Sequence, residues 1–387
     1  MTSYRRPARF LAATLAFFAI PALAAPAQTQ EIRIELYTMG PGNYLFSKFG
    51  HAALCVVDPD GAEGRCFNYG TADFSTPGPL TWAVLRGRAE FWVSVASLDD
   101  MLRLYRAEDR TIYRQVLPLS VDEAAELKRA LTTNALPENR SYEYDHFLDN
   151  CSTRPRDHID QATGGGLQRN AADGSGTFRA LIRQNLENEP SYFLVAEVFL
   201  GRPMDRARSE YEAMFLPHVL RDAVQKHLLV IPEVVYARRA PIRSRPSLVV
   251  AHRLALAFGV GFAGGLVILM SSPRVSSGLQ SLFACLFGTL GCTVWALAIL
   301  SPLPELRYNE ILLVFLPADF FLLLGSTRVT FISRGVYAGV RVAGLVLVGL
   351  LLVSGVLMQP LGTFLALTLP VLSATWARAL APSPQAR

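Results

Sequence analysis

The sequence predicts an α+β domain followed by a C-terminal bundle of about five transmembrane helices. Three observations predict this architecture. Apolar and polar residues alternate from Glu31 onward, which marks strands, and residues 119–134 read as a capped amphipathic helix. The chain after about residue 248 consists mainly of apolar runs. With 387 residues, of which 51% are hydrophobic, the chain is long enough for one domain of about 200 residues plus a membrane part.

The net charge and the absence of one kind of motif indicate which partners to expect. A formal charge of +5, from 37 basic and 32 acidic residues, is modest and spread along the chain. It fits contact with an anionic membrane surface. No nucleic-acid recognition motif appears, so we do not expect a nucleic-acid partner.

Residues 1–24 have the features of a signal peptide. Arginines within residues 5–9 form a charged start, residues 10–20 form a short apolar run, and Ala-Leu-Ala at 22–24 fits a cleavage site. The alternative is an uncleaved anchor, but the apolar run is short for a membrane span. We therefore expect export of a domain covering residues 25–235. No cysteine follows the cleavage site, so the protein is not expected to be a lipoprotein itself.

The first part of that domain reads as strands. IRIELYTM at 32–39 alternates as a strand does, and the loop GPGN follows it. FGHAALCVVD at 49–58 and RCFNYG at 65–70 form the two arms of a hairpin around the turn DPDG. This places His51 near the start of the first arm. In the later helix, Ser120 and Glu123 form a capping box, and we assign no chemistry to it.

Cys55 and Cys66 flank the hairpin turn. In an oxidising compartment such a pair is predicted to form a disulfide. The alternative is two unpaired thiols on opposite faces of the strands. Pairing would leave Cys151 as the free thiol outside the membrane part, which suits a nucleophile.

A polar stretch, YDHFLDNCSTRPRD at 144–157, carries the strongest chemical signal. Cys151 follows Asn150 and is predicted to open a helix that has Pro155 in its first turn, where proline is tolerated. The unpaired N–H groups and the dipole at a helix start favour thiolate over thiol. A lone cysteine is more often a small buried hydrophobe. The polar, turn-rich approach favours the catalytic interpretation.

A nucleophilic thiol needs a base, and His51 is the best candidate. Asn68 on the neighbouring strand could orient the imidazole, because an amide does so without adding charge. It could equally just end the strand. His146 is a weaker rival base, and His158 is expected at a helix end or on the surface.

The C-terminal part begins with a basic, proline-broken linker at 236–247, whose arginines we expect against phospholipid headgroups. The predicted membrane part covers residues 248–378, and residues 379–387 form a tail. Five apolar segments are predicted at about 248–270, 279–301, 308–325, 336–358 and 361–377. The third segment is short and only Gln359-Pro360 separates the last two, so a count of four stays open.

Arginine placement predicts the orientation of this part. If the first domain lies outside, the following arginines fall in the cytoplasm, as the positive-inside rule requires: Arg274, Arg328, Arg334, Arg378 and Arg387. No row of buried acids or bases appears in the apolar segments, which argues against a pump or ion transporter.

Three stretches resemble one known family. They are GPGNYLFSKFGHAAL at 40–54 with the following FNYGTADF, YDHFLDNCSTRPRD at 144–157, and LGRPMDRARSEYEAMFLPHVL at 200–220. In order and rough separation they resemble the Lnb N-terminal periplasmic domain family, over residues from about 32 to 220. The resemblance implies a permuted papain-like fold, a small antiparallel sheet plus helices, as in the lecithin:retinol acyltransferase-like enzymes.

The resemblance also implies a function. Cys151 would be the nucleophile and His51 the base, with Asn150, Asp157 and Asp205 as candidate substrate-binding residues. The best-described members are implied to move an acyl chain within bacterial lipoproteins, from the glycerol to the N-terminal amine. We therefore expect a thiol acyltransferase or hydrolase in the bacterial inner membrane, with its catalytic domain in the periplasm.

The expected partners are lipoproteins or phospholipid, and no metal or cofactor is implied. Two alternatives stay open. A thiol enzyme acting on peptidoglycan peptides would have an open polar groove in place of an apolar slot facing the membrane. A non-catalytic binding module would keep its function after Cys151→Ala.

Overall fold

The computed structural model describes residue 2 and residues 32–44, 47–58, 64–174, 176–187, 189–241, 250–323 and 333–381. Within these residues the first part of the chain is α+β, with one seven-stranded antiparallel sheet in the order β6-β4-β3-β2-β1-β5-β7. The strands are β1 (Arg33–Met39), β2 (His51–Val57), β3 (Arg65–Thr71), β4 (Glu90–Ser97), β5 (Ile112–Val116), β6 (Ser141–Glu143) and β7 (Glu233–Tyr236). The sheet is larger than the small one that the sequence predicts.

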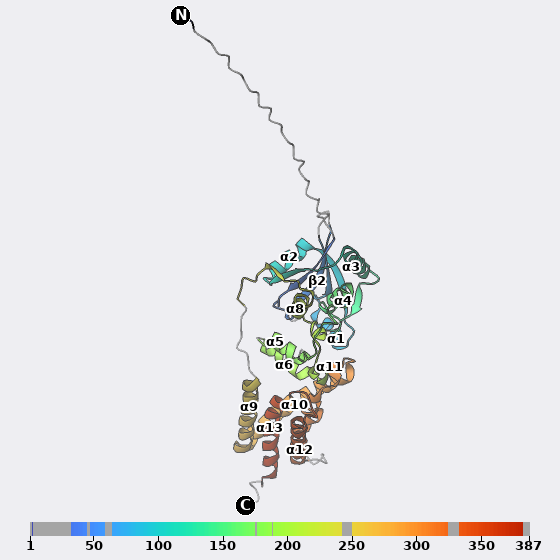
Figure 1. Ribbon diagram of the computed structural model, residues 1–387. Helices are drawn as coiled ribbons and strands as arrows, with labels where there is room; N and C mark the ends of the chain where they lie inside the picture. Colours follow the sequence, from blue (N-terminus) through green and yellow to red (C-terminus); the bar gives the residue numbers. More distant parts are fainter. Residues whose placement is uncertain are drawn as a thin grey trace, which may run out of the picture.

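Helices cover both faces of this sheet (Figure 1). The helices of this part of the chain are α1 (Pro77–Leu85), α2 (Leu98–Ala107), α3 (Val121–Asn134), α4 (Thr153–Ala162), α5 (Phe178–Leu186), α6 (Pro190–Phe199), the 3₁₀ helix η2 (Arg202–Asp205), α7 (Glu210–Ala213) and α8 (Pro217–Leu228). Of these, α5, α6 and η2 pack in a cluster of their own between the sheet and the membrane helices (Figure 1). The predicted capping box of α3 is confirmed.

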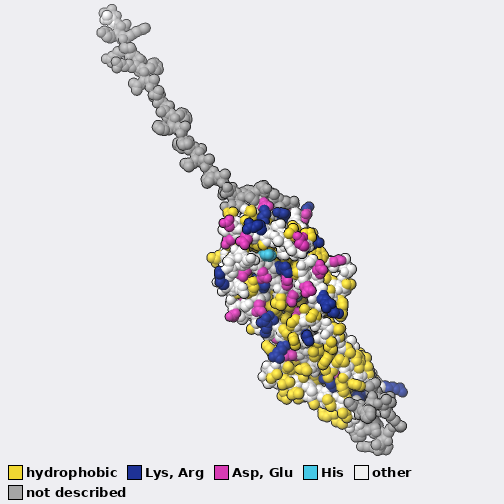
Figure 2. Space-filling view, turned by 90° about the vertical axis from the view of Figure 1, so that its right-hand side faces the viewer, with side chains coloured by type: hydrophobic (Ala, Val, Ile, Leu, Met, Phe, Trp, Pro, Cys, Tyr) yellow, Lys and Arg dark blue, Asp and Glu magenta, His cyan; other side chains and the backbone are white. Residues whose placement is uncertain are grey.

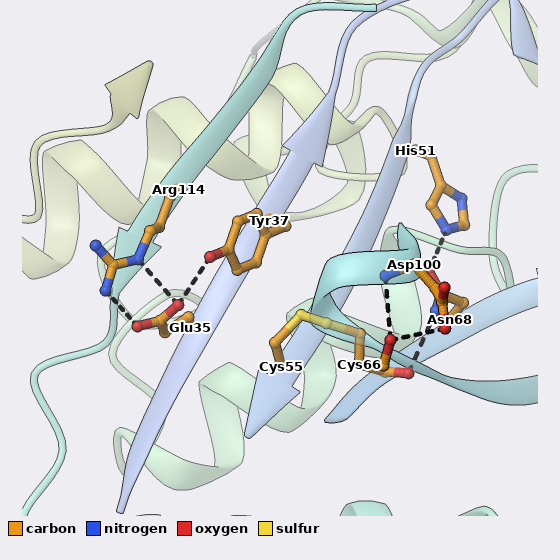
Figure 3. Close-up of a disulfide and its surroundings, with 9 residues drawn as sticks. Glu35, Tyr37, His51, Cys55, Cys66, Asn68, Asp100 and Arg114 are labelled. Atoms are coloured by element: carbon orange, nitrogen blue, oxygen red, sulfur yellow. Dashed lines mark hydrogen bonds and ion pairs between the residues drawn. A yellow bond between two sulfur atoms is a disulfide. The ribbon is translucent and has the colours of Figure 1, made fainter. Parts of the chain in front are cut away.

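Alternation along the central strands explains the two covered faces. In β1, Ile34 and Leu36 pack in one core cluster together with residues of α3, α4 and α8. Tyr37 and Met39 pack in another cluster, with Met101 of α2. Because side chains of a strand point alternately to its two sides, β1 and β2 are buried on both. Cys55 and Cys66 lie directly opposite each other in the β2–β3 ladder and form a disulfide (Figure 3).

The C-terminal part contains four helices long and apolar enough to cross a membrane, among the described residues. These are α9 (Val250–Met270), α10 (Pro273–Leu300), α12 (Arg334–Val353) and α13 (Gly362–Leu380). Hydrophobic side chains gather over this end of the molecule in Figure 2, and charged side chains over the sheet domain.

The third predicted segment, 308–325, is not a spanning helix over its described residues, 308–323. Its described residues form two short 3₁₀ helices, η3 (Glu310–Leu313) and η4 (Pro317–Leu323). Asp319 of η4 is fully buried and forms an ion pair with Arg341 of α12, at 2.7 Å from Oδ1 to Nε. A proline and buried acidic side chains interrupt the apolar run. Of the two counts left open by the sequence, the described residues therefore support four spanning helices.

The two parts of the chain meet through a polar seam. The N–H of Gly201 donates to the carbonyl of Glu305, a residue of α11 (Pro304–Arg307), at 2.6 Å. The Asn309 Nδ2 donates to the Val198 carbonyl at 2.8 Å. Gln359, which precedes α13, donates to the Leu200 carbonyl at 3.0 Å. These bonds join the end of α6 to the segments that connect the membrane helices, and α6 lies close to those segments in Figure 1.

Several sequence predictions fall partly outside the described residues, among them the hairpin turn at 59–61, Arg328, Arg387 and the tail from residue 382. The signal peptide at 1–24 lies there except for residue 2, as do residues 242–247 of the linker. The start of the linker belongs to the sheet domain: Tyr236 ends β7, and the Arg239 N–H donates to Asp109 at 2.8 Å.

Candidate functional site

His51 is the first residue of β2, opposite Met39, the last residue of β1. Gly50 precedes it with φ +91°, and a Cβ at this position would lie 2.7 Å from the Met39 carbonyl oxygen. Only glycine accepts this backbone conformation and this close approach at little cost. The chain can therefore turn sharply at Gly50 and place His51 at the first position of the central strand β2.

Asn68 of β3 fixes the tautomer of His51 (Figure 3). The His51 Nε2 lies 3.3 Å from the Asn68 Oδ1, and the Asn68 Nδ2 donates to the Cys66 carbonyl at 3.3 Å. The second bond orients the amide, so its oxygen faces the ring and can only accept. Nε2 therefore carries the proton, and Nδ1 keeps a free lone pair that can act as a base.

Asn150 positions the turn that carries Cys151. Its Oδ1 accepts from the N–H groups of Ser152 and Thr153 at 2.7 and 2.9 Å. Its Nδ2 donates to the carbonyls of His146 and Phe215 at 2.6 and 3.0 Å. The predicted substrate-binding residue Asn150 is thus buried and fully hydrogen-bonded within the fold.

Cys151 lies in a turn, two residues before α4 begins at Thr153. The backbone N–H of Ala52 donates a hydrogen bond to its sulfur. Gly70, at the end of β3 with φ +81°, leaves room for it, since a Cβ on Gly70 would lie 3.0 Å from the Cys151 Cβ. Because Ala52 directly follows His51, the thiol lies near the end of β2 at which His51 begins the strand.

Both groups are uncharged at neutral pH. Burial raises the pKa of Cys151 to about 11, against the opposing effects of the Ala52 N–H and Arg110. Burial, together with the charge of Arg110, lowers the pKa of His51 to about 4, and the bond to Asn68 opposes this. The expected thiolate is therefore not the resting state. The helix begins two residues later than predicted, and desolvation outweighs its dipole.

Two residues of the site escaped the sequence analysis, Tyr105 and Arg110. The ring of Tyr105 stacks on that of His51 with centroids 5.8 Å apart. The guanidinium of Arg110 lies over the same tyrosine ring, at 4.7 Å from its centroid. Tyr105 belongs to α2 and Arg110 to the turn before β5. No motif marks them, because only the folding of α2 against the sheet brings them to His51.

The other predicted residues make contacts within the fold. Asp157 is exposed and accepts from the Tyr211 hydroxyl at 2.8 Å. Asp205 forms a two-bond ion pair with Arg179, at 2.7 and 2.9 Å, which ties η2 to α5. Glu212, also in the third matching stretch, completes a capping box with Ser209. The structure thus joins His51 to Asn68 and sets the turn of Cys151 against Ala52 and Gly70 of the same two strands.

The rival histidines have other partners. His146 sits among the rings of Phe49, Phe147 and Phe215, with Nδ1 at 3.2 Å from the Tyr144 hydroxyl. Burial lowers its pKa to about 4. His158 Nε2 lies 2.8 Å from the Tyr69 hydroxyl. Both rings are therefore held by neighbours other than the Cys151 sulfur.

No cluster of three His, Cys, Asp or Glu side chains that could hold a metal ion occurs in the part of the chain that the structure describes. Two surface hollows, of about 630 and 80 Å³, lie along α3, and His158 lines the smaller one. Neither is lined by Cys151 or His51, so they have no bearing on the thiol chemistry.

Comparison with known proteins adds one finding. The model of the family described as Lnb N-terminal periplasmic domain matches residues 21–184, less than half of the chain, and this stretch holds His51, Asn68 and Cys151. No curated protein and no solved structure matches. The family match and the four apolar helices together indicate a membrane-anchored protein with a periplasmic domain similar to that family.

Proposed function

We propose that this protein is a thiol acyltransferase or hydrolase of the inner membrane, acting on acyl esters of lipoproteins or phospholipid through a cysteine thioester. One observation carries the proposal: the Cys151 sulfur accepts from the N–H of Ala52, the residue after His51, and the His51 Nε2 lies 3.3 Å from the Asn68 Oδ1. These contacts support a site that has a nucleophile, a base and a group that orients the base.

The chemistry follows from these groups. The His51 Nδ1 takes the thiol proton as the sulfur attacks the ester carbonyl carbon. The tetrahedral intermediate then collapses to a thioester, and the leaving alkoxide takes the proton back from the imidazolium. An amine or water attacks the thioester next, with His51 again accepting the proton, and the thiol is restored. Because the resting pair is neutral, proton transfer has to accompany attack.

The oxyanion of each intermediate requires a donor. Asn150 already occupies the N–H groups of Ser152 and Thr153. The N–H of Cys151 makes no hydrogen bond to another backbone group among the described residues, and it faces its own sulfur. It is therefore the best-placed backbone donor. The buried charge of Arg110 adds a positive potential to the same region.

Two further observations support a lipid substrate and the fold type. The polar seam at Gly201 and Asn309 joins the sheet domain directly to the apolar helices, so the thiol domain is held at the membrane, where acyl esters reside. The strand histidine precedes the cysteine in the chain, an order that fits a permuted papain-like enzyme.

The test uses the full chain in detergent with a synthetic diacylated lipopeptide and phospholipid. Mass spectrometry follows acyl groups on the N-terminal cysteine of the peptide. We expect the acyl chain to move to the amine, or to be released, with the wild-type protein and not with Cys151→Ala. Cys285→Ala, which removes an exposed thiol of α10, is the matched control and should remain active. Product formation by Cys151→Ala, or cleavage of peptidoglycan peptides in place of esters, would refute the proposal.

A further inference from the structure

Arg110 carries a hydrogen-bond donor that has no partner. Its side chain is 4% exposed. Its Nε donates to the Gly40 carbonyl at 2.8 Å and its Nη1 to the Glu108 carboxylate at 3.1 Å. Its Nη2 is buried and unpaired among the described residues. A charged donor withdrawn from water without an acceptor costs free energy, and folded proteins satisfy nearly all such groups.

This donor belongs to the Cys151 site. The Arg110 guanidinium and the His51 imidazole both contact the ring of Tyr105, at 4.7 and 5.8 Å between centres. Gly40, which Arg110 holds, follows the strand residue that pairs with His51. The charge of Arg110 also acts on the thiol of Cys151 and on His51.

Among the residues that the structure describes, two other buried arginines of the sheet domain each have one unpaired nitrogen, but both are paired with a carboxylate and neither contacts the Cys151 site. Arg208 pairs with Glu212. Arg179 forms a two-bond pair with Asp205 and donates to the carbonyls of Leu200 and Gly201. Its charge is compensated by a buried carboxylate. The acidic partner of Arg110, Glu108, has a side chain that is 38% exposed to water, so a positive charge remains available beside the thiol.

We infer that Arg110 is an anion-binding group of this site and that it receives the phosphate of an amphiphile. Resting on the proposed function, this names the acyl donor as an ester that carries a phosphate near the scissile bond. A guanidinium suits this role because its fixed fork of N–H donors matches phosphate oxygens. Phosphate binding there would give the unpaired Nη2 of Arg110 a hydrogen-bond acceptor. It would also place the neighbouring ester against Cys151.

The experiment measures protection of Cys151 from alkylation by iodoacetamide in the full-length protein, followed by peptide mass spectrometry. The probes are dodecyl phosphate, dodecanol and inorganic phosphate at equal concentration. We expect dodecyl phosphate to slow alkylation roughly tenfold to a hundredfold more than dodecanol, the range for a charge-assisted hydrogen bond. Arg110→Gln should reduce this protection to the dodecanol level, and Arg110→Lys should restore part of it.

Arg103→Gln is the matched control, because it removes an exposed guanidinium of α2 and should leave protection unchanged. Thermal unfolding of each variant checks that it is folded. Equal protection by dodecyl phosphate and dodecanol, or full protection in Arg110→Gln, would overturn the inference. Equal protection by inorganic phosphate would overturn the assignment to an amphiphile. Since the readout is alkylation, phosphate binding can be established even if no acyl transfer occurs.

Discussion

The backbone N–H of Ala52 donates a hydrogen bond to the sulfur of Cys151. This bond joins the start of β2 to the turn before α4, and its donor directly follows His51 in the chain. The surrounding side chains bury part of both groups, which is why both pKa values move toward the neutral forms. The predictions below follow from this balance and from the packing of the membrane part.

The alkylation rate of Cys151 should keep rising with pH. Burial raises the pKa of the thiol to about 11, and only the thiolate reacts with iodoacetamide. The rate constant should therefore increase about tenfold per unit between pH 7 and 9. Peptide mass spectrometry separates Cys151 from Cys285 and Cys292. A plateau below pH 8 would show a stabilised thiolate and contradict the pKa.

Replacing Asn68 should change the basicity of His51. Asn68→Asp keeps an acceptor for the Nε2 proton and adds a negative charge 3.3 Å from the ring nitrogen in the present structure. An adjacent carboxylate stabilises the imidazolium, so the pKa of His51 should rise above its value of about 4. The measurement is an NMR titration of the His51 ring.

Asn68→Ala provides the comparison. It removes the acceptor, so both tautomers of His51 become populated and the rate of acyl transfer should fall roughly tenfold or more. An unchanged rate with a folded protein would mean that Asn68 has only a structural role.

The sheet domain should lose stability on mild acidification. The pKa values of His51 and His146 are both lowered to about 4 by burial, whereas the unfolded chain has about 6.5. Between pH 6.5 and 4 the histidines are protonated in the unfolded state and neutral in the folded state. The free energy of unfolding therefore decreases as the pH drops from 6.5 toward 4. Each histidine contributes up to about 3 kcal/mol.

Denaturant unfolding followed by tryptophan fluorescence at pH 7 and pH 5 checks this. His146→Gln removes one titrating group and should reduce the loss of stability between the two pH values, with the remainder due to His51 and to His158 and His218, whose pKa values burial also lowers. A loss equal to that of the wild type would show that His146 titrates normally in the folded protein.

The Asp319–Arg341 pair should be critical for the membrane part. Asp319 also accepts from the Tyr337 hydroxyl, at 2.9 Å, and both charged side chains are buried. Arg341→Ala leaves an unpaired buried carboxylate and should destabilise the protein by about 3–5 kcal/mol.

Asp319→Ala combined with Arg341→Ala should cost less than the sum of the two single substitutions, because neither charge is then left alone. Thermal unfolding in detergent measures all three variants. Additive losses would mean that the pair is not coupled.

Local patterns determined much of this fold from the sequence alone. Residues 33–39, 51–57 and 65–71 are strands where the alternation predicts them, because a strand's two-residue period is a local property. Ser120 and Glu123 predict the start of α3, since a capping box involves neighbours in the chain. Long apolar runs predict the membrane helices, as each span is continuous.

Only the tertiary structure decided the features that depend on contact between distant segments. Arg110 and Tyr105 lie against His51 because α2 packs on the sheet. The thiol of Cys151 is neutral because β2 and β3 bury it. Residues 310–323 do not form a membrane-spanning helix, because Asp319 among them forms an ion pair with Arg341 of α12. Burial and charge pairing are set by all the surrounding chain, so no single stretch of sequence can reveal them.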